Sequence, residues 1–167
     1  MKAVYQGAAR LMGMDDAVWR RHANPWAGLS RFTALPLLVL AIWSRVWIGS
    51  FAWLAVGAAL VWIWWNPRAF APPSTLNHWV SRADLGEQVF LHRRDELPRH
   101  HLAWADGLSL AALPGVCLLA WGLWRLDPTA TLSGMALTVL PKLWFCDRMV
   151  WLYADWCRAQ GKELGDV

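Results

Sequence analysis

The C-terminal part of the chain carries the residues with the clearest potential for binding chemistry. It contains the segment KLWFCDRMVWLYAD, residues 142–155. At about 100° per residue on a helix, four side chains of this segment fall within an arc of roughly 60° and alternate indole with charge: Trp144, Arg148, Trp151 and Asp155. An indole face attracts a guanidinium by about 0.5–2 kcal/mol. Both tryptophans are therefore predicted to stack on Arg148.

Arg148 also requires an anionic partner. Asp106, Asp147 or Asp155 can supply a carboxylate, and a lipid headgroup can supply a phosphate. An ionisable side chain within a membrane is a candidate functional residue. At the end of a transmembrane helix, the same side chain can instead anchor the helix at the membrane surface. Asp147 and the four residues of the stripe are therefore candidates for lipid or partner binding, with structural anchoring as the alternative.

The histidines are the candidate metal ligands of the sequence. Only two of the five are close together, the adjacent His100 and His101. Neighbouring side chains on a helix point about 100° apart and do not easily share a ligand position. We therefore predict no metal site and no cofactor, and we assign Arg99, His100 and His101 to lipid or partner binding. No phosphate-binding glycine loop or nucleophile elbow is present.

A second aromatic and basic cluster lies near the start of the chain, in the segment WRRHANPW. Its candidate binding residues are Trp19, Arg20, Arg21, His22 and Trp26. A basic cluster beside a membrane attracts anionic lipid by about 1 kcal/mol per cation. This segment is therefore predicted to lie in the headgroup region, with packing on the helical bundle as the alternative.

Apolar helices must position these side chains. The chain is 57% hydrophobic and 17% charged and contains 15 Trp, whereas soluble domains carry about 25% charged residues. Four uncharged runs occupy residues 32–44, 46–66, 107–124 and 128–141. The second run has 21 residues, enough to cross a hydrocarbon core of about 30 Å. The shorter first run requires Arg45 to extend to the far interface.

The predicted fold class is all-α and integral to a membrane, with four short transmembrane helices in two hairpins and cytoplasmic interfacial helices. A water-soluble bundle is disfavoured because the runs lack a polar face. We expect one membrane domain, 1–167, with interfacial helices at 1–30, the first hairpin at 31–66, an interfacial segment at 67–104, the second hairpin at 105–156 and a tail at 157–167.

Local signals subdivide the interfacial segment. Ser74 or Thr75 is a candidate cap for a helix ending at Arg82. The spacing of Asp84 and Glu87 is that of a capping box, which predicts a second helix. A third helix is predicted to start at Pro98.

The placement of the cations predicts how the chain is threaded. Of the 16 Lys and Arg, 14 lie in the N-terminal segment up to Arg31, in residues 67–106 or from Lys142 onward, and only Arg45 and Arg125 lie at the two hairpin tips. By the positive-inside rule, both termini and the central segment are cytoplasmic. A nucleic-acid partner is not expected, because the cations are spread along a membrane boundary. The expected partners are membrane lipids, other membrane subunits or further copies of the chain.

Several of these segments together resemble a family of small, uncharacterised prokaryotic multi-pass membrane proteins. The resemblance rests on WRRHANPW, on FAPP followed by WVSR, on PRHH and on KLWFCDRMVWLY. It covers most of the chain. It implies a membrane protein of bacterial or archaeal type, so the predicted location is a prokaryotic inner membrane, and it implies no activity.

Three functions remain open from the sequence. The first is a non-enzymatic accessory, scaffold or lipid-binding subunit, favoured by small-residue faces that allow close helix packing, such as those at Gly57 and Gly134. The second is an enzyme, metal-dependent or not, acting on a lipid or isoprenoid at the inner surface. The third is a small transporter, disfavoured because the runs lack an ionisable residue near their centres.

Overall fold

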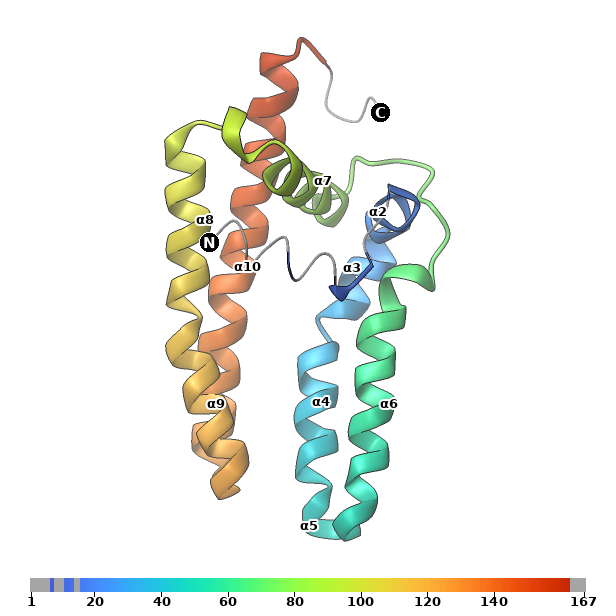
Figure 1. Cartoon of the computed structure of the whole chain (residues 1–167), viewed down its shortest axis with the longest axis vertical. Coiled ribbons are helices and arrows are strands. Elements are labelled where there is room, and N and C mark those ends of the chain that lie inside the picture. Colours follow the sequence, from blue (N-terminus) through green and yellow to red (C-terminus); the bar gives the residue numbers. More distant parts are fainter. Residues whose placement is uncertain (1–6, 8–10, 14–15, 163–167) are drawn as a thin grey trace.

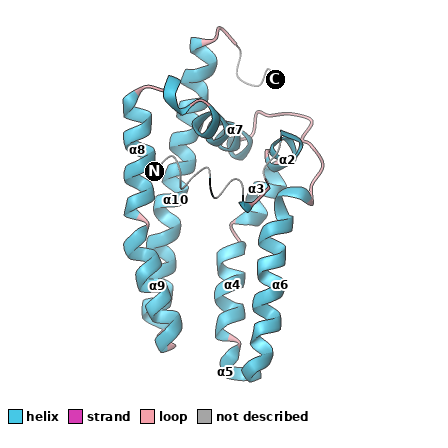
Figure 2. Cartoon of the chain, in the orientation of Figure 1, coloured by secondary structure: helices cyan, strands magenta, loops and turns pink. Residues whose placement is uncertain are grey.

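The structure is a computed structural model that describes residue 7, residues 11–13 and residues 16–162. This described part is all-helical, with 83% helix and no strands (Figure 2). The predicted all-α class is therefore confirmed. Most of the predicted interfacial helix before Asp16 and the end of the predicted tail, residues 163–167, lie outside the described residues.

The first hairpin consists of two helical legs that lie side by side and turn at their far end (Figure 1). Its elements are α3 (Pro25–Arg31), α4 (Ala34–Trp43), α5 (Arg45–Ile48), η1 (Gly49–Phe51), α6 (Ala52–Trp65) and η2 (Asn66–Arg68). The Asn24 side chain caps α3 by accepting a hydrogen bond from the Trp26 amide at 2.8 Å. Gly49 permits the turn because its φ of 57° lies in the left-handed region.

The second hairpin is longer and more closely packed. Its elements are α8 (Arg99–Ala111), α9 (Leu113–Arg125) and α10 (Pro128–Ala159). Pro128 is the first residue of α10, as predicted, and the Asp127 carboxylate caps this helix by accepting from the Ala130 amide at 2.8 Å. At the tips, the Arg45 guanidinium donates hydrogen bonds to the carbonyls of Leu123 and Trp124. These carbonyls end α9, so Arg45 neutralises the negative end of that helix.

A polar layer closes the end of the molecule opposite the tips. It contains α2 (Asp16–His22), α7 (Trp79–His92) and η3 (Arg94–Glu96), and α7 crosses the hairpins in Figure 1. Gly86 allows α7 to approach α10 closely, because a Cβ there would lie 2.0 Å from the Met149 carbonyl oxygen. Beneath this crossing is a core cluster of apolar side chains: Phe90, Leu97, Ala105, Leu108, Phe145, Met149 and Leu152.

The predicted caps within residues 67–98 are partly wrong. A single helix, α7, runs from Trp79 through Asp84 and Glu87, and its cap is the His78 ring, whose Nδ1 accepts from the Val80 amide at 3.2 Å. Asp84 does not begin a helix because its carboxylate binds a distant arginine instead. α8 begins at Arg99, one residue after the predicted start at Pro98, which is the residue that precedes the helix.

Among the described residues, two helical segments are long and apolar enough to span a membrane, whereas we predicted four. They are Pro25–Arg68 with 44 residues and Arg99–Arg125 with 27 residues. The first turns back within its length, so its main legs, α4 and α6, have only 10 and 14 residues. The 32-residue α10 is long enough, but its threonines, serine, prolines and charged residues lower its hydropathy.

Candidate functional site

Arg148 lies between aromatic rings on the face that α8 and α10 share. Its guanidinium carbon is 5.1 Å from the ring centroid of Trp104, on α8, and 5.5 Å from that of Trp151, one turn further along α10. The ring of Trp144 packs on Trp104 with centroids 5.4 Å apart. We call Trp104, Trp144, Arg148 and Trp151 the Arg148 site.

The predicted stacking is confirmed for Trp151 and wrong for Trp144. Trp104 occupies the position that was expected for Trp144, because α8 packs along the same face of α10. The periodicity of one helix shows which of its own residues share a face, and it does not show which side chain the neighbouring helix contributes. Trp104 is therefore the residue of this site that sequence analysis missed.

The three carboxylates considered as partners of Arg148 bind other groups. Asp106 accepts from Arg94 at 2.6 Å, Asp147 accepts from the Trp79 indole at 3.4 Å, and Asp155 pairs with Arg158 at 2.7 Å. Within the described residues, no carboxylate lies within the 4.0 Å ion-pair distance of Arg148. Its Nε is buried and has no hydrogen-bond partner there. Arg148 is thus held in place by rings and retains its capacity to bind an anion.

A histidine–aspartate cluster lies beside the Arg148 site and consists of His100, His101 and Asp155. His101 is 3% exposed, and its Nε2 lies 3.1 Å from the Asp155 Oδ2. One potential ligand atom from each of the three residues lies within 4.8 Å of the other two. The premise that adjacent histidines cannot approach a common ligand position does not hold here, because the two rings lean together with centroids 4.1 Å apart.

A surface hollow adjoins both groups of residues. Its volume is about 480 Å³, and it is lined by His100, Ala103, Trp104, Gly107 and Leu108. The lining is mainly apolar, with His100 from the cluster and Trp104 from the Arg148 site. An amphipathic molecule can therefore place its polar end near Arg148 and its apolar part along α8.

The N-terminal candidates divide into buried and outward-facing residues. Trp19 and His22 are 5% and 8% exposed and pack edge to face, with ring centroids 5.3 Å apart. Arg20, Arg21 and Trp26 are exposed. The outward part of this cluster is therefore smaller than the sequence suggests. Arg99, from the candidate segment before His100, is also exposed.

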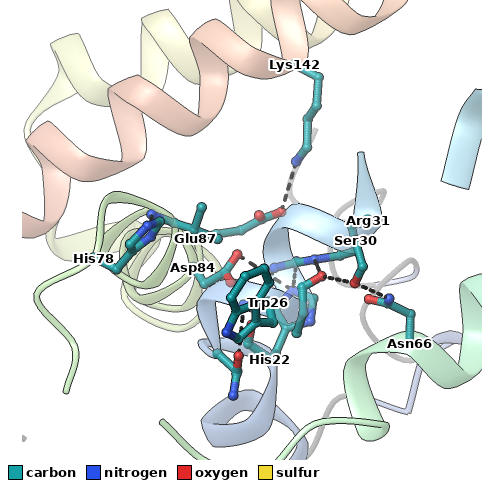
Figure 3. A network of polar contacts seen from close by, with 12 residues as sticks. His22, Trp26, Ser30, Arg31, Asn66, His78, Asp84, Glu87 and Lys142 are labelled. Atoms are coloured by element: carbon teal, nitrogen blue, oxygen red, sulfur yellow. Dashed lines mark hydrogen bonds and ion pairs between the residues drawn. The ribbon is translucent and has the colours of Figure 1, made fainter. Parts of the chain in front are cut away.

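A buried ion-pair network, formed by His22, Arg31 and Asp84, joins α2, α3 and α7 (Figure 3). Arg31 Nη2 lies 2.6 Å from Asp84 Oδ2, and His22 Nε2 lies 3.8 Å from Asp84 Oδ1. The Arg31 guanidinium also contacts the His22 ring. Burial raises the pKa of Asp84 to about 6, although the Arg31 charge opposes this shift. Burial, and then the Arg31 charge, lower the pKa of His22 well below its usual value.

A second ion pair connects this network to the second hairpin. Lys142 Nζ, on α10, lies 3.5 Å from Glu87 Oε1, on α7 (Figure 3). The hollow between these elements is small, about 130 Å³. Each of its cations has a carboxylate partner, since Arg31 binds Asp84 and Lys142 binds Glu87. This balance of charge suits a structural connection between the hairpins better than an anion site.

Sequence analysis missed the buried network because Asp84 was assigned a local role as a helix cap. A signal was nevertheless present in the sequence. The buried face of α7 includes Val80, Ala83 and Asp84, so a carboxylate lies on a face that is otherwise apolar or small. Buried carboxylates require a charged or hydrogen-bonding partner.

Comparison with known proteins gives a family and no activity. No curated protein and no solved structure matches the chain. A family model described as a family of unknown function (DUF6653) matches residues 3–165. Because this match covers nearly the whole chain, the protein belongs to the DUF6653 family.

Proposed function

We propose that this protein is a multi-pass membrane protein that binds the phosphate of an anionic lipid at the Arg148 site. In this proposal it is a non-enzymatic accessory or scaffold subunit of a prokaryotic inner membrane. Both hairpins lie in the bilayer, and the polar layer and both termini are cytoplasmic. The carrying observation is Arg148 itself, a cation held by two indoles without a carboxylate partner among the described residues.

The apolar surface of the hairpins supports a membrane location. Trp47, Trp53, Leu54 and Trp124 are each 70–76% exposed. Soluble monomers rarely expose contiguous apolar patches larger than a few hundred Å². In a bilayer this surface faces hydrocarbon, and indoles near the hairpin tips lie at the water boundary, where tryptophan is enriched.

The lengths of the helical legs are compatible with this placement. At 1.5 Å per residue, residues 25–43 extend about 28 Å and residues 99–125 about 40 Å. A hydrocarbon core is about 30 Å thick. We therefore propose four membrane passes, with two of them in the folded-back segment Pro25–Arg68.

The position of Arg148 is suited to a lipid phosphate. The Arg148 site lies on α8 and α10 on the polar-layer side of the second hairpin, because α7 packs directly on the neighbouring residue Met149. A guanidinium forms strong, charge-assisted hydrogen bonds with phosphate oxygens. The apolar hollow along α8 then provides a surface for the acyl chain next to the headgroup.

Replacing Arg148 with glutamine is expected to weaken binding of phosphatidylglycerol about 10-fold or more. The loss follows from removing charge-assisted hydrogen bonds worth about 1.5–3 kcal/mol. Native mass spectrometry of the full chain in a neutral detergent, titrated with phosphatidylglycerol or phosphatidylcholine, measures this change. The wild-type protein should retain phosphatidylglycerol in preference to phosphatidylcholine.

Arg125→Gln is the matched control. It removes the same charge from the same hairpin, but at the exposed tip opposite the polar layer, and it should leave phosphatidylglycerol binding unchanged. Equal binding by wild type and the Arg148 variant, or equal loss in both variants, would contradict the proposal.

The second candidate function is an enzyme acting on a bound lipid or isoprenoid. The observation that favours it is the contact between His101 and Asp155, since a carboxylate can orient an imidazole as a general base. The same mass measurement separates the two candidates. An enzyme changes the mass of the bound lipid during incubation, whereas an accessory subunit returns it unaltered.

A further inference from the structure

The histidine–aspartate cluster combines three metal-binding side chains from two helices. His100 and His101 come from the first turn of α8, and Asp155 comes from the last turns of α10. The His101 side chain is 2% exposed, and the Asp155 carboxylate lies between His101 and Arg158 and contacts both, whereas His100 is exposed and has room to rotate. Two ligands that are already in position and one that can rotate can close around an ion without a change of backbone.

The distances between the ligand atoms of His100, His101 and Asp155 fit a first-row divalent metal after a small movement of one side chain. Ligand bonds of about 2.0–2.2 Å place neighbouring ligand atoms of a tetrahedral site roughly 3.3–3.6 Å apart. His101 Nε2 and Asp155 Oδ2 are already 3.1 Å apart. The largest separation in the cluster is at most 4.8 Å. Rotation of the exposed His100 side chain can bring its ring nitrogen into this range.

The charges around the cluster leave one carboxylate oxygen for the metal. Asp155 Oδ1 pairs with Arg158 at 2.7 Å, while Oδ2 faces His101. Arg148, on the preceding turns of α10, is a further cation beside the cluster, and it offsets part of the attraction for a metal ion. The neutral imidazoles and Oδ2 therefore supply the binding, and Arg158 holds the carboxylate in its orientation.

We infer that His100, His101 and Asp155 form a binding site for a divalent transition metal such as Zn²⁺ or Fe²⁺. Two histidines and one carboxylate are a donor set that binds these ions and leaves coordination positions open. The open positions adjoin the apolar hollow along α8, because His100 lines both. The inference does not depend on lipid binding at Arg148.

Titration of the full chain with Co²⁺ in neutral detergent, without added lipid, tests the site. After treatment with a chelator, the wild-type protein should bind one equivalent of Co²⁺ and develop the visible d–d bands of a four- or five-coordinate ion. Losing even an outer partner of a metal ligand costs about 10–100-fold in affinity. The variants His100→Ala and Asp155→Asn, which lose direct ligands, should therefore bind at least about 100-fold more weakly.

His92→Ala is the matched control. It removes an exposed histidine of α7 that lies outside the cluster, and it should retain the wild-type affinity and spectrum. His100 is exposed and Asn has the shape of Asp, so both test variants should fold, which circular dichroism checks. Failure of the folded wild type to bind Co²⁺, a thiolate-to-cobalt charge-transfer band, or equal loss in the His92 variant would overturn the inference.

Discussion

Replacing Asp84 with alanine is expected to lower the free energy of unfolding by about 3 kcal/mol. The carboxylate is 7% exposed and binds Arg31, whose side chain is 27% exposed. Removing one member of a buried ion pair leaves the other charge without compensation, which typically costs about 3–5 kcal/mol. The partial exposure of Arg31 places the expected loss at the lower end. Chemical unfolding in a mild detergent measures it.

Two further variants test whether the loss of stability is specific to the buried Arg31–Asp84 ion pair. Glu96→Ala breaks the pair with Arg93, in which the side chains are 61% and 53% exposed, and should change stability by no more than about 1 kcal/mol. The double variant Arg31→Met with Asp84→Ala removes both charges of the buried pair. It should regain part of the lost stability. If the Asp84 and Glu96 variants were equally stable, the buried network would have no special role in joining the hairpins.

The second large effect is expected at the contact between α9 and α10. A Cβ at Gly134 would lie 2.3 Å from the Leu119 amide nitrogen, and one at Gly115 would lie 2.5 Å from the Leu137 carbonyl carbon. Gly134→Ala must therefore push the two helices apart. We expect a loss of about 2–3 kcal/mol or more, as for other overpacked sites, although alanine is the better helix former by about 1 kcal/mol.

Gly57→Ala provides the control in the other hairpin. Gly57 lies within α6, and a Cβ there would meet no atom within 4 Å. This variant should be as stable as the wild type or up to about 1 kcal/mol more stable. Thermal unfolding of both variants in the same detergent makes the comparison. Equal stability of the two would mean that α9 and α10 are not packed as closely as described.

Much of the helical architecture could be predicted from local patterns. The uncharged runs on either side of Arg45 and Arg125 correspond to the legs of the two hairpins, and Asp127 with Pro128 begins α10. Small residues indicated close packing correctly at Gly134. At Gly57 the same reasoning fails, because α6 presents that position to open space.

The number of membrane spans was harder to predict than the positions of the helices. Uncharged runs were counted as spans, but a charged residue that ends such a run does not have to end the helix. Lys142 ends the fourth uncharged run, but α10 continues to Ala159, in agreement with the helix expected over residues 142–155. In this part of α10, α7 packs on Met149, and α8 contacts Arg148 and Asp155.

Only those residues of the candidate site that lie on one helix could be predicted from the sequence. Helical periodicity correctly grouped Arg148 with Trp151, which lie on one helix. Trp104 and His101 reach this face from α8, and no spacing within residues 142–155 contains that information. Asp84 is a similar case, since its partner Arg31 is 53 residues away along the chain.

Cysteine accessibility in intact cells tests most directly whether the hairpins cross a membrane with the polar layer on one side. In a background with Cys117, Cys146 and Cys157 replaced by serine, single cysteines are introduced by Ser50→Cys, Arg125→Cys, Glu96→Cys and Lys162→Cys. An impermeant thiol reagent should label the Ser50 and Arg125 variants from outside, and the Glu96 and Lys162 variants only after permeabilisation. Labelling of the Glu96 and Lys162 variants from opposite sides, or of all four from the same side, would contradict this arrangement.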